Sequence, residues 1–154
     1  MNIFVLDANP KLCAQYHNDK HCSKMILESV QMLSTALRLS GIERGYKITH
    51  AQHPCTKWVR QSLSNWLWLA ELTYELNKEW RYRFNHIYDH KSFTVLIDEL
   101  TTPLIDDIGL TPFAQAMPDH LRSSSAITSY RNYYKEEKRH IAKWSKRTPP
   151  AWWK

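Results

Sequence analysis

The sequence predicts an all-α fold, and three observations lead to this prediction. The chain has 154 residues but only 3 glycines, too few for the many tight turns of β-sandwiches and barrels. Two long stretches carry apolar residues at steps of three and four, which is the period of an amphipathic helix. The length suits one hydrophobic core. We therefore expect residues 1–154 to form a single compact domain built around a long central helix.

The first elements follow in chain order. Met1–Asp7 is expected to be a short strand or an extended arm. A helix from about Asn18 to Ser40 follows, with Asn18 or Asp19 as its N-cap and Gly41 at its C-terminal end. Its apolar stripe consists of Cys22, Ile26, Val30, Leu33 and Leu37.

The second long helix is expected to begin near Pro54, because a proline at the first helical position loses no hydrogen bond. It continues to about Phe84 and is apolar on much of its circumference. A helix with this pattern belongs at the centre of a fold.

The second half of the chain is expected to hold three shorter elements. A helix at Ser92–Leu100 precedes a loop at Thr101–Leu110, and Thr111–Met117 is predicted as another helix. The last helix should begin near the serines at 123–125 and continue to about Ser145.

The positive charge is concentrated at the C-terminal end. The formal net charge is +6, and from Arg122 onward nine basic residues face only two acidic ones. This distribution favours a polyanionic partner, with nucleic acid as the first candidate. The alternative is a basic helix that is simply solvated.

Several classes of protein are disfavoured by the sequence. No apolar run approaches the roughly 20 residues that span a bilayer, and the first residues do not resemble a signal peptide. We therefore expect no membrane partner and an intracellular, cytoplasmic location. Cys13, Cys22 and Cys55 lack CxxC spacing and are expected to be reduced and buried. No phosphate loop or dinucleotide fingerprint is present, so no cofactor is expected.

The first long helix carries an ordered polar stripe opposite its apolar one. His21, Lys24, Glu28 and Gln31 are spaced so that they share a helix face. A carboxylate beside cationic groups is suited to acid–base chemistry. A helix face turned to water has the same appearance, and this alternative stays open at the level of sequence.

Two other patterns are weaker. The pairs His17/His21 and His86/His90 have the spacing of helical metal ligands, but neither has an obvious third ligand, so no metal site is expected. Cys55 next to His53 could form a thiol nucleophile, but a buried structural cysteine is the favoured interpretation.

The last helix and the tail interleave aromatic and basic residues. Bases stack on aromatic rings while lysine and arginine contact phosphates, so this mixture suits nucleic-acid binding. The alternative is that the aromatic rings point inward and the charges outward. The candidate phosphate ligands include Lys138 and Arg139, and the aromatic residues are Tyr130, Tyr133, Tyr134, Trp144, Trp152 and Trp153.

Taken in order, several short motifs resemble the pyrimidine-dimer DNA glycosylases of the phage endonuclease V type. Asp19-x-His21 followed by Glu28 matches the family's early catalytic helix, and His53 with the aromatic helix after it is similar to its second helix. AITSYRNYYK matches A-I-x-x-x-R-x-x-x-K, which gives Arg131 and Lys135 the family's DNA-contacting positions. The closing RTPPAWW is similar to the family's aromatic tail.

This resemblance implies an endonuclease V-like fold and an N-glycosylase, with possible AP-lyase activity, that flips a nucleotide out of double-stranded DNA. Glu28 would be the general acid/base, and His21 and Lys24 would tune it. The nucleophile would be the α-amine of Met1, because Asn2 is a bulky neighbour that usually leaves the methionine in place. Lys20 or Lys24 is the fallback amine. Gln31 and His53 would contact DNA, the protein would be a monomer, and a phage origin would fit.

Two departures from the family keep other functions open. The family has arginines directly before its glutamate and three residues after it, where this chain has Leu27 and Gln31. The substrate is therefore expected to be a damaged or modified pyrimidine whose identity the sequence does not give. One alternative is a transferase that modifies a pyrimidine in phage DNA. Another is a DNA-binding protein without catalysis.

Overall fold

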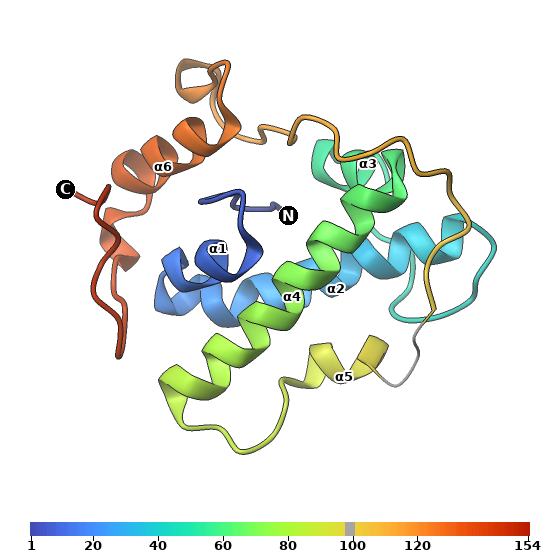
Figure 1. Cartoon of the computed structure of the whole chain (residues 1–154), viewed down its shortest axis with the longest axis horizontal. Helices are drawn as coiled ribbons and strands as arrows, with labels where there is room; N and C mark the ends of the chain where they lie inside the picture. The colour runs from blue at the N-terminus through green and yellow to red at the C-terminus, as the bar shows by residue number, and fades with distance from the viewer. Residues whose placement is uncertain (98–100) are drawn as a thin grey trace.

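The computed structural model describes residues 1–97 and 101–154, and this part of the chain is entirely helical with connecting loops (Figure 1). It contains six α-helices and no strand, so the predicted all-α fold is confirmed. The elements are α1 (Pro10–Tyr16), α2 (Asp19–Leu39), α3 (Pro54–Gln61), α4 (Leu63–Phe84), α5 (Lys91–Ile97) and α6 (Ala126–Glu137), with 3-10 helices at Asp119–Leu121 and Arg139–Ile141.

The longest helix, α4, crosses α2 in the middle of the molecule, and α1, α3 and α5 pack against one or both of them (Figure 1). Both long helices bury several large apolar side chains, among them Met32, Leu37, Leu69 and Leu76. The expected central helix is therefore present, as α4.

The predicted long helix is interrupted at Ser62, whose backbone is extended with φ −155° and ψ 145°. Its hydroxyl donates to Asp107 Oδ1 at 3.1 Å and accepts the N–H of Ile108, also at 3.1 Å. Leu63 N donates to the carbonyl of Asp106 at 3.0 Å. These contacts to a distant segment replace the intrahelical bonds, so α3 and α4 are two helices instead of one.

The ends of α2 agree closely with the sequence. The side chain of Asn18 accepts the N–H of His21 at 2.9 Å and caps the first turn. After Ser40, Gly41 has φ +100° and the N–H of Ile42 donates to Leu37 C=O at 3.0 Å. This bond across a left-handed residue is the Schellman ending, which favours glycine at that position.

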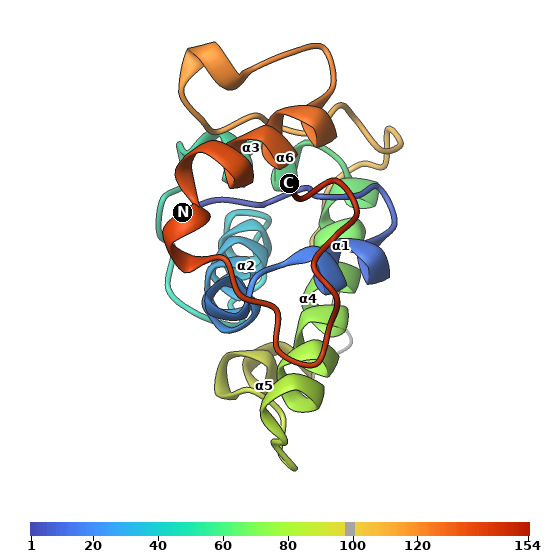
Figure 2. The same ribbon diagram turned by 90° about the vertical axis from the view of Figure 1, so that its left-hand side faces the viewer.

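The N-terminal segment is an extended arm and not a strand. Residues 3–6 are buried, and the ring of Phe4 lies among the rings of His21, Tyr130 and Tyr134. In both views the arm passes between α6 and α2 (Figures 1 and 2). Helix α1 follows it and was not predicted, although Asn9 caps it and Pro10 opens it.

The predicted helix at Thr111–Met117 is wrong, because this segment is extended. The N–H of Thr111 donates to Asn65 Oδ1 at 3.0 Å, and the N–H of Ala116 donates to the hydroxyl of Tyr130 at 3.1 Å. Tyr130 on α6 thus takes a backbone N–H that a helix would pair internally, while Asn65 on α4 holds the first residue of the segment.

The last helix is shorter than predicted. Helix α6 begins after the cap of Ser125, as expected, but ends at Glu137 and not near Ser145. The following chain turns back, and Asp19 accepts both the N–H and the hydroxyl of Ser145 at 2.9 and 2.5 Å. The helix predicted at Ser92–Leu100 is present as α5, and residues 98–100 lie outside the described part. Within that part, no helix has the length and apolar character that crossing a membrane requires.

Candidate active site at the N-terminal amine

The α-amine of Met1 lies 3.2 Å from Oε1 of Glu28, which is on α2. The backbone N–H of Asn2 donates to the same carboxylate oxygen at 3.0 Å. The side chain of Met1 is only 3% exposed although the residue as a whole is half-buried. The exposed part of Met1 is therefore its main chain, which carries the amine.

Glu28 is buried, with 7% of its surface exposed. A buried carboxylate is costly unless it is paired and hydrogen-bonded, and here two main-chain nitrogens supply the partners. The alternative that this residue sits on a water-facing helix surface is therefore wrong. The sequence-predicted acid/base candidate and the predicted amine are in direct contact.

Lys24 lies one turn before Glu28 on α2, with Nζ 3.8 Å from Oε2. Its side chain is 66% exposed, so it covers the rim of the site and not its interior. Gln31 is half-buried one turn further along α2, and Leu27 is exposed. The rim therefore presents an amine and an amide but no guanidinium at these positions.

His53 stands at the start of α3, where its Nδ1 accepts the N–H of Cys55 at 3.1 Å. Its pKa is lowered, first by burial and then by the positive charges of the Met1 amine and His50. His53 is therefore close to the Met1 amine, and its Nε2 takes no part in the cap of α3.

Cys55 is fully buried next to the same site, and burial raises the pKa of its thiol to about 11. Its Sγ donates to Asn2 Oδ1 at 3.5 Å. A thiol in this state is inert, so the structural interpretation of Cys55 holds.

An open hollow of about 620 Å³ lies beside α3, between this helix and the extended segment 112–114. Trp58, Lys57 and Arg60 line it, with glutamines at 52 and 61. The hollow therefore offers the ring of Trp58 and the cationic side chains of Lys57 and Arg60, which follow His53 closely in the sequence.

The sequence model of one family, described as pyrimidine dimer DNA glycosylase, matches residues 1–92, more than half of the chain. The chain belongs to this family. The matched region runs from the arm through α4 and into the start of α5, and it contains Met1, Glu28 and His53. Searches of curated proteins and of solved structures found no match.

Membership of this family makes the protein a DNA-acting enzyme and confirms the resemblance seen in the sequence. The match ends before α6, so it does not cover the motifs at residues 126–135 and 147–153. Only their contacts in the structure bear on their role.

His21 does not have the role that the sequence predicted for it. Its Nδ1 is 2.7 Å from the hydroxyl of Tyr134, and its ring stacks on Phe4 at 4.3 Å. Burial lowers its pKa to about 2, so the imidazole is neutral at physiological pH. A neutral ring cannot tune Glu28 by its charge. His21 instead joins α2 to α6 and to the arm.

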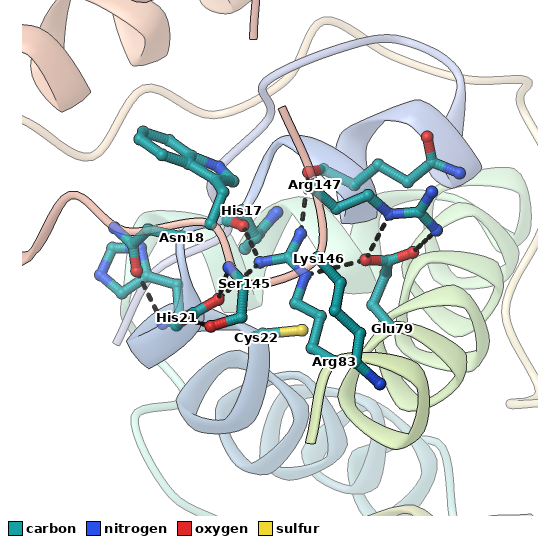
Figure 3. A network of polar contacts seen from close by, with 12 residues as sticks. His17, Asn18, His21, Cys22, Glu79, Arg83, Ser145, Lys146 and Arg147 are labelled. Carbon is teal, nitrogen blue, oxygen red and sulfur yellow. Dashed lines mark hydrogen bonds and ion pairs between the residues drawn. The ribbon is translucent and has the colours of Figure 1, made fainter. Parts of the chain in front are cut away.

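Asp19, the first residue of the D-x-H motif, belongs to an ionic network around Arg83 and Glu79, whose contact Figure 3 shows. The guanidinium of Arg83 donates to Glu79 at 2.9 Å and to Asp19 at 3.3 Å, and Arg147 binds the other side of Glu79. Asp19 also holds the tail at Ser145. The motif thus combines a structural aspartate with a catalytic candidate nine residues later.

Arg131 was predicted to contact DNA, but its guanidinium is largely occupied inside the protein. Nε donates to the carbonyl of Leu6 at 2.9 Å, and Nη2 pairs with Asp7 at 3.1 Å. The group also lies over the rings of Tyr16 and Trp152, at 5.7 and 5.4 Å from their centroids. These contacts tie α6 to the N-terminal arm.

The other predicted phosphate ligands are more available. Lys135 is half-buried on α6 and has no ion pair with a described residue. Lys138 lies over the ring of Tyr133 at 5.1 Å, and Arg139 over that of Trp153 at 5.0 Å. Lys138 and Arg139 thus each lie on an aromatic ring, in line with the interleaved aromatic and basic residues of the sequence.

Within the described residues, neither histidine pair belongs to a group of three or more side chains close enough to hold a metal. His17 is bonded through Nδ1 to the carbonyl of Cys13 at 2.7 Å, and His86 stacks on Trp80. A separate group lies at the end of α6, where the exposed side chains of His120, Glu136 and Glu137 approach one another within 4.8 Å. It has no connection to the amine.

Proposed function

We propose that the protein is a DNA N-glycosylase with AP-lyase activity that acts on a damaged or modified pyrimidine in double-stranded DNA. The Met1 α-amine is the nucleophile, and Glu28 transfers the protons. The observation that carries this proposal is the 3.2 Å contact between the amine and Glu28 Oε1, in a chain whose family consists of DNA glycosylases.

The reaction begins with attack on carbon. The neutral form of an α-amine is the nucleophile, and an α-amine generally loses its proton more readily than a lysine side chain does. Its lone pair bonds to C1′ of the sugar, and the bond between C1′ and the base breaks. The electron pair leaves with the base, which takes up a proton.

The next steps need a base at the amine. Glu28 accepts a proton from the nitrogen, and the bond between C1′ and the ring oxygen breaks. The ring oxygen takes up that proton as the sugar ring opens, and an imine forms between Met1 and C1′. In the lyase step a proton leaves C2′, its electron pair forms a carbon–carbon double bond, and the 3′ phosphate departs. Glu28 is within hydrogen-bond reach of the nitrogen, the first requirement of a general base.

The surrounding residues support binding. Lys24 and Gln31 lie at the rim on α2, and His53 lies on the other side of the amine at α3. Lys135, Lys138 and Arg139 extend a basic surface over α6 and the turn after it, which suits phosphate contacts.

The test is turnover on duplex oligonucleotides that each carry one altered pyrimidine, with a cyclobutane dimer and an abasic site included. We expect base release from at least one of them and strand cleavage at the abasic site. Glu28→Gln should abolish both, whereas Glu71→Gln, on the exposed face of α4, should leave them unchanged.

Borohydride trapping identifies the nucleophile. It reduces the imine to a stable amine, so digestion and mass spectrometry should locate DNA on the Met1 peptide. An adduct on Lys20 or Lys24 would contradict the assignment of Met1 while it would keep the glycosylase chemistry.

A transferase is the second candidate, because Leu27 and Gln31 replace the arginines of the family around Glu28. Such an enzyme would change the mass of a base without releasing it and would give no borohydride adduct. Salt-sensitive binding without either reaction would indicate a protein that only binds DNA.

A further inference from the structure

The side chain of Asn2 is buried, and both its oxygen and its nitrogen make hydrogen bonds. Its Oδ1 accepts the N–H of Ile3 at 2.8 Å and the hydroxyl of Tyr130 at 3.0 Å, besides the thiol of Cys55. Its Nδ2 donates to the carbonyl of Ala116 at 2.9 Å. The residue is 9% exposed, so these bonds lie out of competition with water.

The partners of Asn2 come from parts of the chain that are far apart in sequence. Cys55 is on α3, Ala116 is in the extended segment before α6, and Tyr130 is on α6. Tyr130 is itself fixed, because its hydroxyl also contacts the carbonyl of Ala114 at 2.9 Å and accepts the N–H of Ala116. Burial raises its pKa well above 10, so it remains a donor.

This cluster determines where the main chain of residues 1 and 2 lies. With the amide of Asn2 held on both sides, its N–H and the amine of Met1 both meet Oε1 of Glu28. A terminal residue has no preceding peptide bond to hold it, so free rotation would otherwise spread the amine over many orientations.

We propose that Asn2 is a positioning residue for the Met1 amine, an inference that rests on the proposed function. Reacting groups held in the productive geometry gain a large part of the rate, and a misplacement of about 1 Å can cost about 100-fold. Asn2 holds the amine in place through its own hydrogen bonds to Tyr130 and Ala116, and it does not contact the substrate.

Asn2 also determines whether Met1 or residue 2 carries the terminal amine. Asn2 is bulky enough to leave Met1 in place, and its side chain fills the site that fixes the arm. A small residue at position 2 would lose both properties at once. The identity of this one side chain therefore couples retention of Met1 to orientation of its amine.

The first experiment needs no DNA. Reductive methylation near neutral pH favours the α-amine over lysines, whose ordinary pKa is about 10.4, and the mass of the N-terminal peptide reports its rate. Asn2→Leu keeps a bulky second residue and removes all four bonds. We expect labelling about fivefold faster than in the wild type, because the amine leaves Glu28.

A double-mutant cycle isolates the coupling. Glu28→Gln should accelerate labelling in the wild-type background but add little in the Asn2→Leu background, where the contact is already lost. Asn77→Leu is the matched control, since Asn77 is buried on α4 with bonds to Asp89 and His90 and lies away from the amine.

The second experiment uses duplex DNA that the wild type processes. With Met1 confirmed by intact mass, Asn2→Leu should slow single-turnover trapping about 10- to 100-fold and leave the Kd for the duplex nearly unchanged. Tyr130→Phe removes one bond to Asn2 from a position 128 residues away and should shift both readouts in the same direction by less. It keeps the proposal testable if Asn2→Leu fails to fold.

The outcomes are separable. If folded Asn2→Leu and Tyr130→Phe both retain Met1, label at the wild-type rate and keep the full effect of Glu28→Gln, the positioning role is overturned. If the wild type processes no duplex, the proposed function fails, while the labelling cycle still decides whether Asn2 holds the amine.

Discussion

The buried guanidinium of Arg83 makes the network around Glu79 a stringent test of how the helices are held together. Its side chain is fully buried at the end of α4. It donates to Glu79 and Asp19 and also to the carbonyls of His17, at 2.6 Å, and Gln15, at 2.8 Å. The two carbonyls lie at the end of α1, where a helix leaves acceptors unpaired and favours a cation.

Arg83→Met removes these four bonds and replaces only the aliphatic part of the arginine side chain. Glu79 keeps Arg147 and Asp19 keeps Ser145, but both carboxylates lose their most buried partner. Breaking a buried ion pair costs about 3–5 kcal/mol of unfolding free energy. At about 2–4 °C per kcal/mol for a chain of this size, Tm should fall by about 6–20 °C.

The assay is thermal and urea unfolding followed by circular dichroism, with the midpoint and the slope compared separately. Arg81→Met is the matched control, because Arg81 lies in the same last turn but is 43% exposed and pairs with Asp89 at the surface. It should cost about 1 kcal/mol or less. If the two variants were equally stable, the buried network would not hold the α1–α4 junction.

Three other predictions follow from single features. Burial lowers the pKa values of His17 and His21 to about 4 and about 2. Below the ordinary histidine pKa of about 6.5, the unfolded chain therefore binds more protons than the folded protein does. Stability should be full above about pH 6.5 and fall toward about pH 4, by up to about 1.4 kcal/mol per pH unit for each histidine; melts that stay constant over this range would contradict it. Gly45→Ala should be more destabilising than Gly41→Ala in urea unfolding, since both have positive φ but only at Gly45 would a Cβ clash with the side-chain oxygen of Ser34 on α2; strain alone, at Gly41, is worth about 1–2 kcal/mol, and equal losses would show that the contact relaxes. Lys135→Met should reduce the slope of log affinity against log salt for duplex DNA by about 1; an unchanged slope in fluorescence anisotropy would place Lys135 outside the interface.

The parts of the fold that the sequence predicted well depend on neighbours along the chain. Helix α2 agrees within a residue because its apolar stripe, the Asn18 cap and Gly41 are all local signals. Asn9 and Pro10 offered the same kind of signal for α1, which could have been predicted from them.

The errors occur where distant residues take the backbone hydrogen bonds. Ser62 ends α3 because residues 106–108 bind it, and the segment before Met117 is not helical because Tyr130 holds the N–H of Ala116. Neither partner is visible in a periodic pattern. The early end of α6 has a similar cause, since Asp19 holds Ser145.

The candidate site was predictable to the extent that the family resemblance supplied it. Glu28 and the terminal amine meet as expected, and the burial of Glu28 is what the sequence could not decide. His21 lies on the same helix, but its environment of Phe4 and Tyr134 depends on the packing of α6 and the arm. The part played by Asn2 has no sequence signal, because its partners are Tyr130 and Ala116.

The link between residue 2 and residue 130 also has a consequence for the order in which the protein is made. Chain synthesis delivers the amine first and the hydroxyl that fixes Asn2 near the end, and contacts of such long sequence separation form late in folding. A ribosome-bound chain that stops before α6 has Glu28 and Met1 but lacks the Tyr130 hydroxyl, which donates to Asn2 Oδ1 in the complete fold. Full alignment of the amine therefore arises only once synthesis is nearly finished, and under the proposed function partial products would be poor catalysts.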